Sequence, residues 1–145
     1  FTPVTRRPWA ELSNGKYLLA TGDLRCTMDP VTGQGANLAS YGAWMWADHI
    51  IAAGGQVDEA LCREYERSVA YRTAGTVNFN NAMLDPEPYL PELMHAMAEN
   101  ADMADDFTRR FACPETLWWE VLKDRQTCDA YMARFSSTAP AAALH

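Results

Sequence analysis

The feature that most constrains the fold is the stretch at residues 22–40, GDLRCTMDPVTGQGANLAS. It follows an apolar run at residues 16–21 that is typical of a strand, and it leads into a proline-free segment with helical patterning. Three glycines, two aspartates and a proline are residues that shape turns. The sequence therefore predicts a strand, a specialised turn and a helix, in that order.

Such a turn has two readings, a ligand site or a tight connection that binds nothing. Asp23 would lie at the carboxyl end of the strand, where ligands of open α/β sheets collect. Gly33 and Gly35 permit positive φ and a close approach of a flat ligand to the main chain. The free amides of the following helix would attract an anionic atom. Spacing alone leaves both readings open.

Beyond this turn the chain reads as helical. A first helix is expected over residues 36–53, ended by Gly54 and Gly55. Asp58 is positioned to cap a second helix that extends towards Leu84, with a kink or break expected at Gly75 and the asparagines that follow it.

Further apolar spacings predict helices after the loop at residues 85–88. They are carried by Leu90, Leu93, Met94 and Met97, by Met103, Phe107 and Phe111, by Leu117, Trp118, Val121 and Leu122 after Pro114, and by Cys128, Tyr131, Met132 and Phe135. We expect residues 136–145 to be a frayed tail. Only one clear strand is visible, at residues 16–21, and its apolar run suggests a strand covered on both faces whose sheet neighbours lie outside this chain.

Charge and composition exclude some partners. A formal net charge of −7 argues against nucleic acid, which requires clustered lysine and arginine. No run of 18 apolar residues is present, so no membrane span is predicted. The four cysteines show no CxxC spacing, and we expect reduced, largely buried thiols in a cytoplasmic protein.

The run LLATGD at residues 18–23, followed by DPVTGQGAN at residues 29–37, resembles the second flavin-binding motif of FAD-dependent aromatic monooxygenases. Its loop, with Cys-Thr-Met-Asp-Pro, is closer to the styrene monooxygenase oxygenase component and its relatives. The resemblance covers roughly residues 15–125, and the motif is its specific part. It implies that this chain is mainly helical, has one or two short strands, and is the C-terminal fragment of an α/β FAD-binding fold.

The resemblance also implies roles for particular residues. Asp23 would bind the ribityl chain of FAD, and Pro30 would lie beside the reactive edge of the isoalloxazine ring. The turn into the helix would hold the N1 and C2 carbonyl edge of the ring through backbone amides, with the contacting residues being Gly33, Gln34, Gly35, Ala36 and Asn37. The family transfers one oxygen atom from a flavin C4a-hydroperoxide, by epoxidation, hydroxylation or sulfoxidation. No side chain here is expected to be catalytic, and none to bind metal.

The family's ADP-binding GxGxxG turn does not occur in this sequence. We therefore expect a fragment that is inactive alone and binds FAD poorly. Residues 1–35 would end the FAD-binding sheet and form the flavin-contacting loop, and residues 36–135 would form a helical substrate-side region. The implied partners are a small apolar or aromatic substrate and a separate flavin reductase. An unpaired strand would also favour self-association of the fragment.

Two alternatives remain open. One is a fragment of a one-component hydroxylase that uses NAD(P)H directly, and the other is a non-enzymatic helical interaction module whose turn is purely structural. Weaker candidates include an apolar pocket lined by tryptophans, which we weigh against ordinary core packing, two isolated histidines and an acidic cluster that reads as a solvated helix face. These residues are Trp44, Trp46, Trp118 and Trp119; His49 and His95; and Asp102, Asp105 and Asp106.

Overall fold

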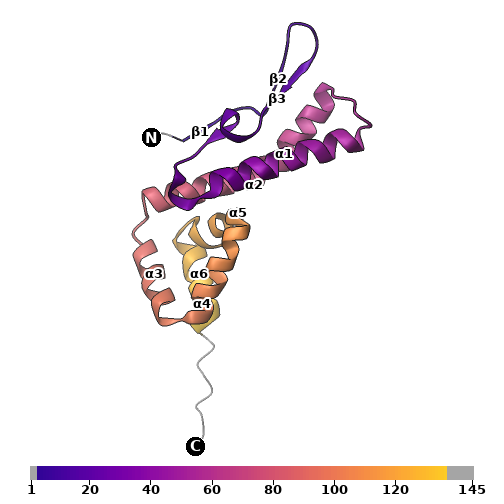
Figure 1. Ribbon diagram of the computed structural model, residues 1–145. Coiled ribbons are helices and arrows are strands. Elements are labelled where there is room, and N and C mark those ends of the chain that lie inside the picture. Colours follow the sequence, from indigo (N-terminus) through magenta and orange to yellow (C-terminus); the bar gives the residue numbers. More distant parts are fainter. Residues whose placement is uncertain (1–2, 137–145) are drawn as a thin grey trace, which may run out of the picture.

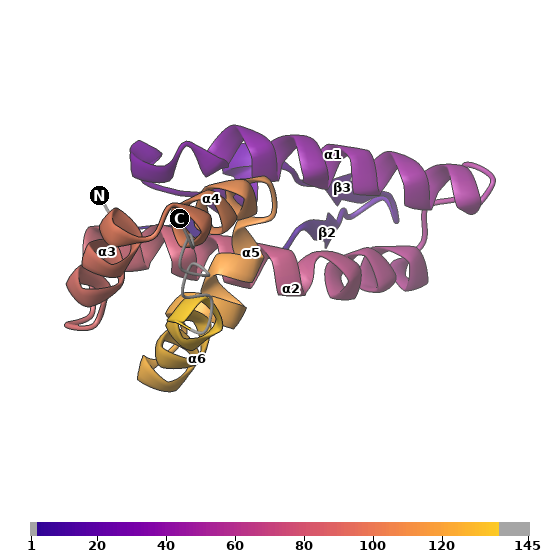
Figure 2. The ribbon, with the colours of Figure 1, turned by 90° about the horizontal axis from the view of Figure 1, so that it is seen from below.

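The computed structural model describes residues 3–136, and most of them are helical. Two long helices, α1 (Gln34–Ala52) and α2 (Glu59–Leu84), lie side by side (Figures 1 and 2). The shorter helices gather around the C-terminal part of α2, and they are α3 (Leu90–Glu99), α4 (Ala101–Arg109), α5 (Pro114–Leu117) and α6 (Arg125–Ser136). The prediction of a mainly helical chain is confirmed. Residues 137–145, most of the predicted tail, lie outside the described part of the chain.

Four short strands form two antiparallel pairs at the N-terminal end. Strand β1 (Val4–Thr5) pairs with β4 (Cys26–Thr27), and β2 (Trp9–Glu11) pairs with β3 (Tyr17–Leu19). Strand β3 is the strand predicted at residues 16–21, and the prediction that its neighbours lie outside the chain is wrong for the edge that β2 occupies.

The physical reason is local. Gly15 has a φ of 73°, and the Asn14 side chain accepts a hydrogen bond from the Lys16 amide at 3.1 Å, so the chain folds back on itself as a hairpin. Leu18 is 48% exposed, and the expectation of a strand covered on both faces therefore does not hold in this chain.

Helix α1 begins at Gln34, two residues before the predicted start, and ends at Ala52. Two glycines with positive φ terminate it as predicted. The Gly54 amide donates to the Ile51 carbonyl, and the Gly55 amide donates to the Ile50 carbonyl.

Asp58 caps helix α2, which begins at Glu59: its side chain accepts a hydrogen bond from the Leu61 amide at 2.8 Å, as predicted. The predicted break does not occur, because α2 continues through Gly75 to Leu84. The residues that weaken a helix locally are used here in tertiary contacts. Gly75 allows α5 to approach so closely that an added Cβ would lie 2.7 Å from the Glu115 Cα.

Hydrophobic side chains form two clusters, and α2 contributes to both. The N-terminal cluster consists of Trp9, Trp46, Cys62, Tyr65 and Val69. The C-terminal cluster consists of Phe79, Tyr89, Leu90, Leu93, Met103, Phe107, Leu117, Val121, Leu122, Cys128 and Tyr131. Because one continuous helix supplies both clusters, the N-terminal strands and the C-terminal helices are held together by α2.

Two further expectations concern membranes and thiols. Among the described residues, no helix is both long and apolar enough to span a bilayer. All four cysteines lie within the described residues, and each is a free thiol. Cys26, Cys62 and Cys128 are buried as expected, and Cys113 is exposed.

Candidate functional site

The end of strand β3 is fixed on the middle of α1. The indole Nε1 of Trp46 donates to the Ala20 carbonyl at 3.3 Å, and the Thr21 hydroxyl donates to the Ala39 carbonyl at 2.9 Å. Gly42 makes this approach possible, since an added Cβ would lie 2.9 Å from the Thr21 Oγ1. The chain must then travel back along α1 to reach the start of that helix, and the predicted turn occupies this return path.

The turn contains two short 3-10 helices, at Gly22–Leu24 and Pro30–Thr32. The Asp29 side chain caps the second one by accepting a hydrogen bond from the Val31 amide at 2.9 Å. Gly33, with a φ of 66°, then turns the chain into α1. This left-handed conformation is one that side chains with a Cβ rarely adopt, so the glycine is needed here for the turn itself.

The N-terminus of α1 presents its first amides without a side-chain cap. Gly33 occupies the N-cap position, and no side-chain hydrogen bond is made there. A Cβ added to Gly35 would meet nothing within 4 Å, so the backbone is open on this side. Unpaired amides at the positive end of a 19-residue helix form a site that can receive a carbonyl oxygen or an anion.

The structure brings the two ends of the predicted motif close together. A gap too small to admit a water molecule separates the Gly22–Leu24 turn from the first turns of α1, and it is lined by Gly22, Arg25, Cys26, Gly35, Leu38 and Ala39. Most residues predicted to contact the cofactor are exposed, namely Asp23, Pro30, Gly33, Gly35, Ala36 and Asn37. They are therefore available to a ligand.

Gln34 differs from the other predicted residues because its side chain is buried. Its Nε2 donates to the Phe111 carbonyl at 3.1 Å, and its Oε1 accepts from Asn37 Nδ2 at 3.0 Å. These bonds tie the start of α1 to the segment between α4 and α5. The side chains of Gln34 and Asn37 thus serve the fold, and at the start of α1 it is the backbone that is open to a ligand.

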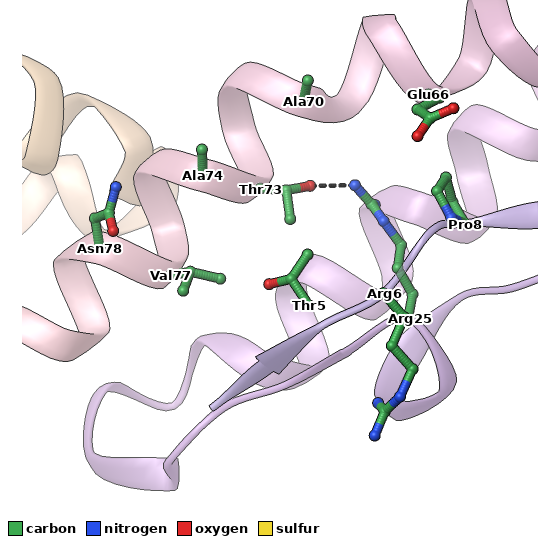
Figure 3. Close-up of a pocket in the computed structure, with 10 residues that line it drawn as sticks. All are labelled: Thr5, Arg6, Pro8, Arg25, Glu66, Ala70, Thr73, Ala74, Val77 and Asn78. Atoms are coloured by element: carbon green, nitrogen blue, oxygen red, sulfur yellow. Dashed lines mark hydrogen bonds between the residues drawn. The ribbon is translucent and has the colours of Figure 1, made fainter. Parts of the chain in front are cut away.

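Sequence reasoning missed Arg25 and its partner Thr73. The Arg25 side chain is buried, crosses to α2 and donates through Nη2 to the Thr73 hydroxyl (Figure 3). Burial raises the pKa of the neighbouring Tyr65 hydroxyl, and the positive charge of Arg25 acts in the opposite direction. One signal was present in the sequence, since Arg25 is the only lysine or arginine between Lys16 and Arg63.

The other candidates are dispersed over the structure. Trp46 stacks on Tyr65 with ring centroids 3.6 Å apart, whereas Trp44 is 61% exposed. Trp118 packs on the C-terminal cluster and Trp119 stacks on Tyr71. The four tryptophans therefore do not line a common pocket.

The histidines and the acidic cluster behave as ordinary structural residues. His49 Nδ1 lies 2.8 Å from the Met45 carbonyl, and His95 is exposed beside Glu99. In the acidic cluster, Asp106 pairs with Arg110 at 2.8 Å, and the hydrogen bond from Arg110 lowers the pKa of its carboxyl. Within residues 3–136 there is no group of three or more histidine, cysteine, aspartate or glutamate side chains that could hold a metal ion.

Comparison with known proteins finds similarity to styrene monooxygenases. The chain is 38% identical over 120 residues to styrene monooxygenase StyA of Pseudomonas sp and 35% identical over 120 residues to styrene monooxygenase StyA of Pseudomonas fluorescens. Each match covers 80% of this chain but 29% of the relative, so the chain spans less than a third of the length of these relatives. No family model matches it. The predicted resemblance is confirmed, and it is consistent with a fragment of a protein of this type.

Proposed function

We propose that this chain is the flavin-contacting and substrate-side part of a flavoprotein monooxygenase that adds one oxygen atom to a small apolar or aromatic substrate. The observation that carries the proposal is the uncapped N-terminus of α1, which closes a Gly-Asp to Gly-Gln-Gly turn in a chain similar to StyA. The parent protein would be a monooxygenase with an α/β FAD-binding fold and a helical C-terminal region.

The residues present fit an FAD at this turn. The exposed Asp23 carboxylate can accept hydrogen bonds from ribityl hydroxyls. The amides of Gly35, Ala36 and Asn37 would lie against the electron-rich edge of the isoalloxazine ring, where fixed dipoles stabilise developing negative charge. Gly35 leaves this approach open, because no atom lies within 4 Å of the position a Cβ would take. Pro30, exposed at the start of its short helix, would border the ring.

FAD, when bound, supplies the oxygen-activating chemistry of such enzymes. The contribution of this chain would be to bind and orient the ring and to exclude water from it. No side chain of the turn is assigned a proton-transfer role. We propose a separate flavin reductase as the source of reduced flavin, and NAD(P)H oxidation by the intact parent without added reductase would favour the one-component alternative instead.

The proposal is tested with Asp23→Ala in the intact parent protein. Removal of a carboxylate that accepts charge-assisted hydrogen bonds is expected to weaken FAD binding by about tenfold, equivalent to about 1.4 kcal/mol. FAD affinity is measured by titration of the apoprotein and flavin fluorescence. The matched control is Asp48→Ala, which removes an exposed carboxylate from the C-terminal half of α1. Unchanged affinity in Asp23→Ala would favour the purely structural reading of the turn.

We also propose that the isolated chain self-associates. Leu18 on β3 is 48% exposed, and on α1 the Trp44 and Ile51 side chains are 61% and 77% exposed. Exposed apolar side chains and an unpaired strand edge favour contact between copies. Sedimentation velocity of the chain over a concentration series is expected to show oligomers that dissociate on dilution, whereas a monomer at every concentration would contradict this.

A further inference from the structure

We propose that a second site on this chain binds a small organic carboxylate in a cavity beside Arg25. The cavity lies between the N-terminal segment and α2, and Arg25 lines both this cavity and the gap beside Gly22 and Gly35. The burial and charge of Arg25 would favour an anion there whether or not flavin is bound.

The cavity has a volume of about 380 Å³, which is within the range of small-molecule sites. Figure 3 shows it between strand β1 and one face of α2. Its apolar wall is formed by Pro8, Ala70, Ala74 and Val77. The polar side chains that line it are Thr5, Arg6, Arg25, Glu66, Thr73 and Asn78. A compact apolar ligand with one polar group would match this lining.

Arg25 is the group in the cavity that favours a negatively charged ligand. It is 5% exposed, its Nη2 donates to Thr73, and its Nε has no hydrogen-bond partner. No carboxylate of the described residues forms an ion pair with it. An uncompensated buried charge is costly, and an anion beside it would relieve that cost.

The other shielded arginines of the chain show what is missing at Arg25. Arg72 lies 3.6 Å from a carboxylate oxygen of Glu115, and Arg110 contacts both Asp106 and Glu120 at 2.8 and 2.7 Å. Each of these guanidinium groups has an acidic partner, although both are more accessible to water than Arg25. The arginine that most needs a counter-ion is thus the one without it.

The remaining charges of the cavity wall already have partners. The Arg6 side chain points away from Thr73 in Figure 3, and its Nη1 donates to the Asp23 carbonyl at 3.2 Å. Glu66 accepts a hydrogen bond from the Trp9 indole at 3.0 Å and lies 4.0 Å from the Arg7 Nε. Glu66 is therefore committed elsewhere, and the cavity retains an excess positive charge at Arg25.

The experiment uses the 145-residue chain labelled with 15N, with benzoate as the probe and benzyl alcohol as its uncharged counterpart. We expect saturable amide shifts confined to the residues around Thr73 and Val77, with benzoate binding at least tenfold more tightly than benzyl alcohol. Arg25→Met should weaken benzoate binding at least tenfold, whereas Arg67→Met, which removes an exposed arginine outside the cavity, should not change it.

A second variant keeps the test decisive if Arg25→Met does not fold. Val77→Trp fills the cavity while leaving Arg25 in place, and it should abolish the benzoate shifts. Equal binding of benzoate and benzyl alcohol, or binding that survives Val77→Trp, would overturn the proposal. A carboxylate could also come from a side chain of the parent polypeptide. Loss of benzoate binding in the intact parent, with the isolated chain still binding, would assign the cavity to that side chain and overturn a small-molecule site.

Discussion

Gly75→Ala is expected to destabilise the chain by about 2 kcal/mol. An added Cβ would lie 2.7 Å from the Cα and Cβ of Glu115 and from the Trp119 Nε1. The backbone of α5 cannot move aside without disturbing the Arg72–Glu115 ion pair and the hydrogen bond from Trp119 to the Tyr71 carbonyl. Overpacking of this kind costs about 1–3 kcal/mol, and contact with backbone atoms places Gly75 at the upper end of that range before any gain in helix propensity.

The measurement is urea unfolding of the chain followed by circular dichroism. Gly35→Ala is the matched control, because it introduces the same methyl group into a helix where nothing lies within 4 Å. This control should be neutral or stabilising by up to about 1 kcal/mol. If Gly75→Ala were equally neutral, the close contact between α2 and α5 would not exist in solution.

Gly35→Ala in the intact parent protein is expected to weaken FAD binding by about 10- to 100-fold, equivalent to about 1.4–2.8 kcal/mol. The added methyl group would project from the first turn of α1 onto the open face of the turn, where the flavin ring would lie. It would separate the ring from the amides that are proposed to hold it. FAD affinity is measured by titration of the apoprotein, in parallel with the Asp23→Ala variant.

This variant separates the two readings of the turn because it leaves the fold intact. If the turn were purely structural, the methyl group would enter open space and leave flavin affinity unchanged. Ser40→Ala, at an exposed position of the same helix outside the gap, controls for raised helix propensity. If Gly35→Ala bound FAD with unaltered affinity, the N-terminus of α1 would not be the place where the flavin is held.

Several elements could be predicted because their signals are local. The Asp58 cap requires one side chain three residues before the amide it accepts from, and the Gly54-Gly55 terminus requires two residues that tolerate positive φ. Helical apolar spacing likewise predicted the C-terminal helices. The hairpin of β2 and β3 was missed because its first strand, β2, is three residues long, too short to show an alternating pattern.

Gly75 was misread and Arg25 was missed for a different reason. A glycine inside a helical pattern reads as a weak point, and here α5 turns it into a point of contact with α2. An arginine in a polar turn is usually exposed. Here Arg25 is buried, bonds to Thr73 of α2 and lines the cavity beside Thr5. Neither partner is near in sequence, so no local signal could report the contact.

The sequence by itself determined the order of strand, turn and helix, the mainly helical composition and the similarity to StyA, because these follow from residue types at fixed short spacings. Only the tertiary structure decided which amides stay uncapped, that α2 runs unbroken beneath α5, and that a buried guanidinium faces a cavity without a counter-ion. Each of these depends on segments up to 48 residues apart meeting in space, as Arg25 and Thr73 do, and such meetings are fixed by the packing of the whole chain.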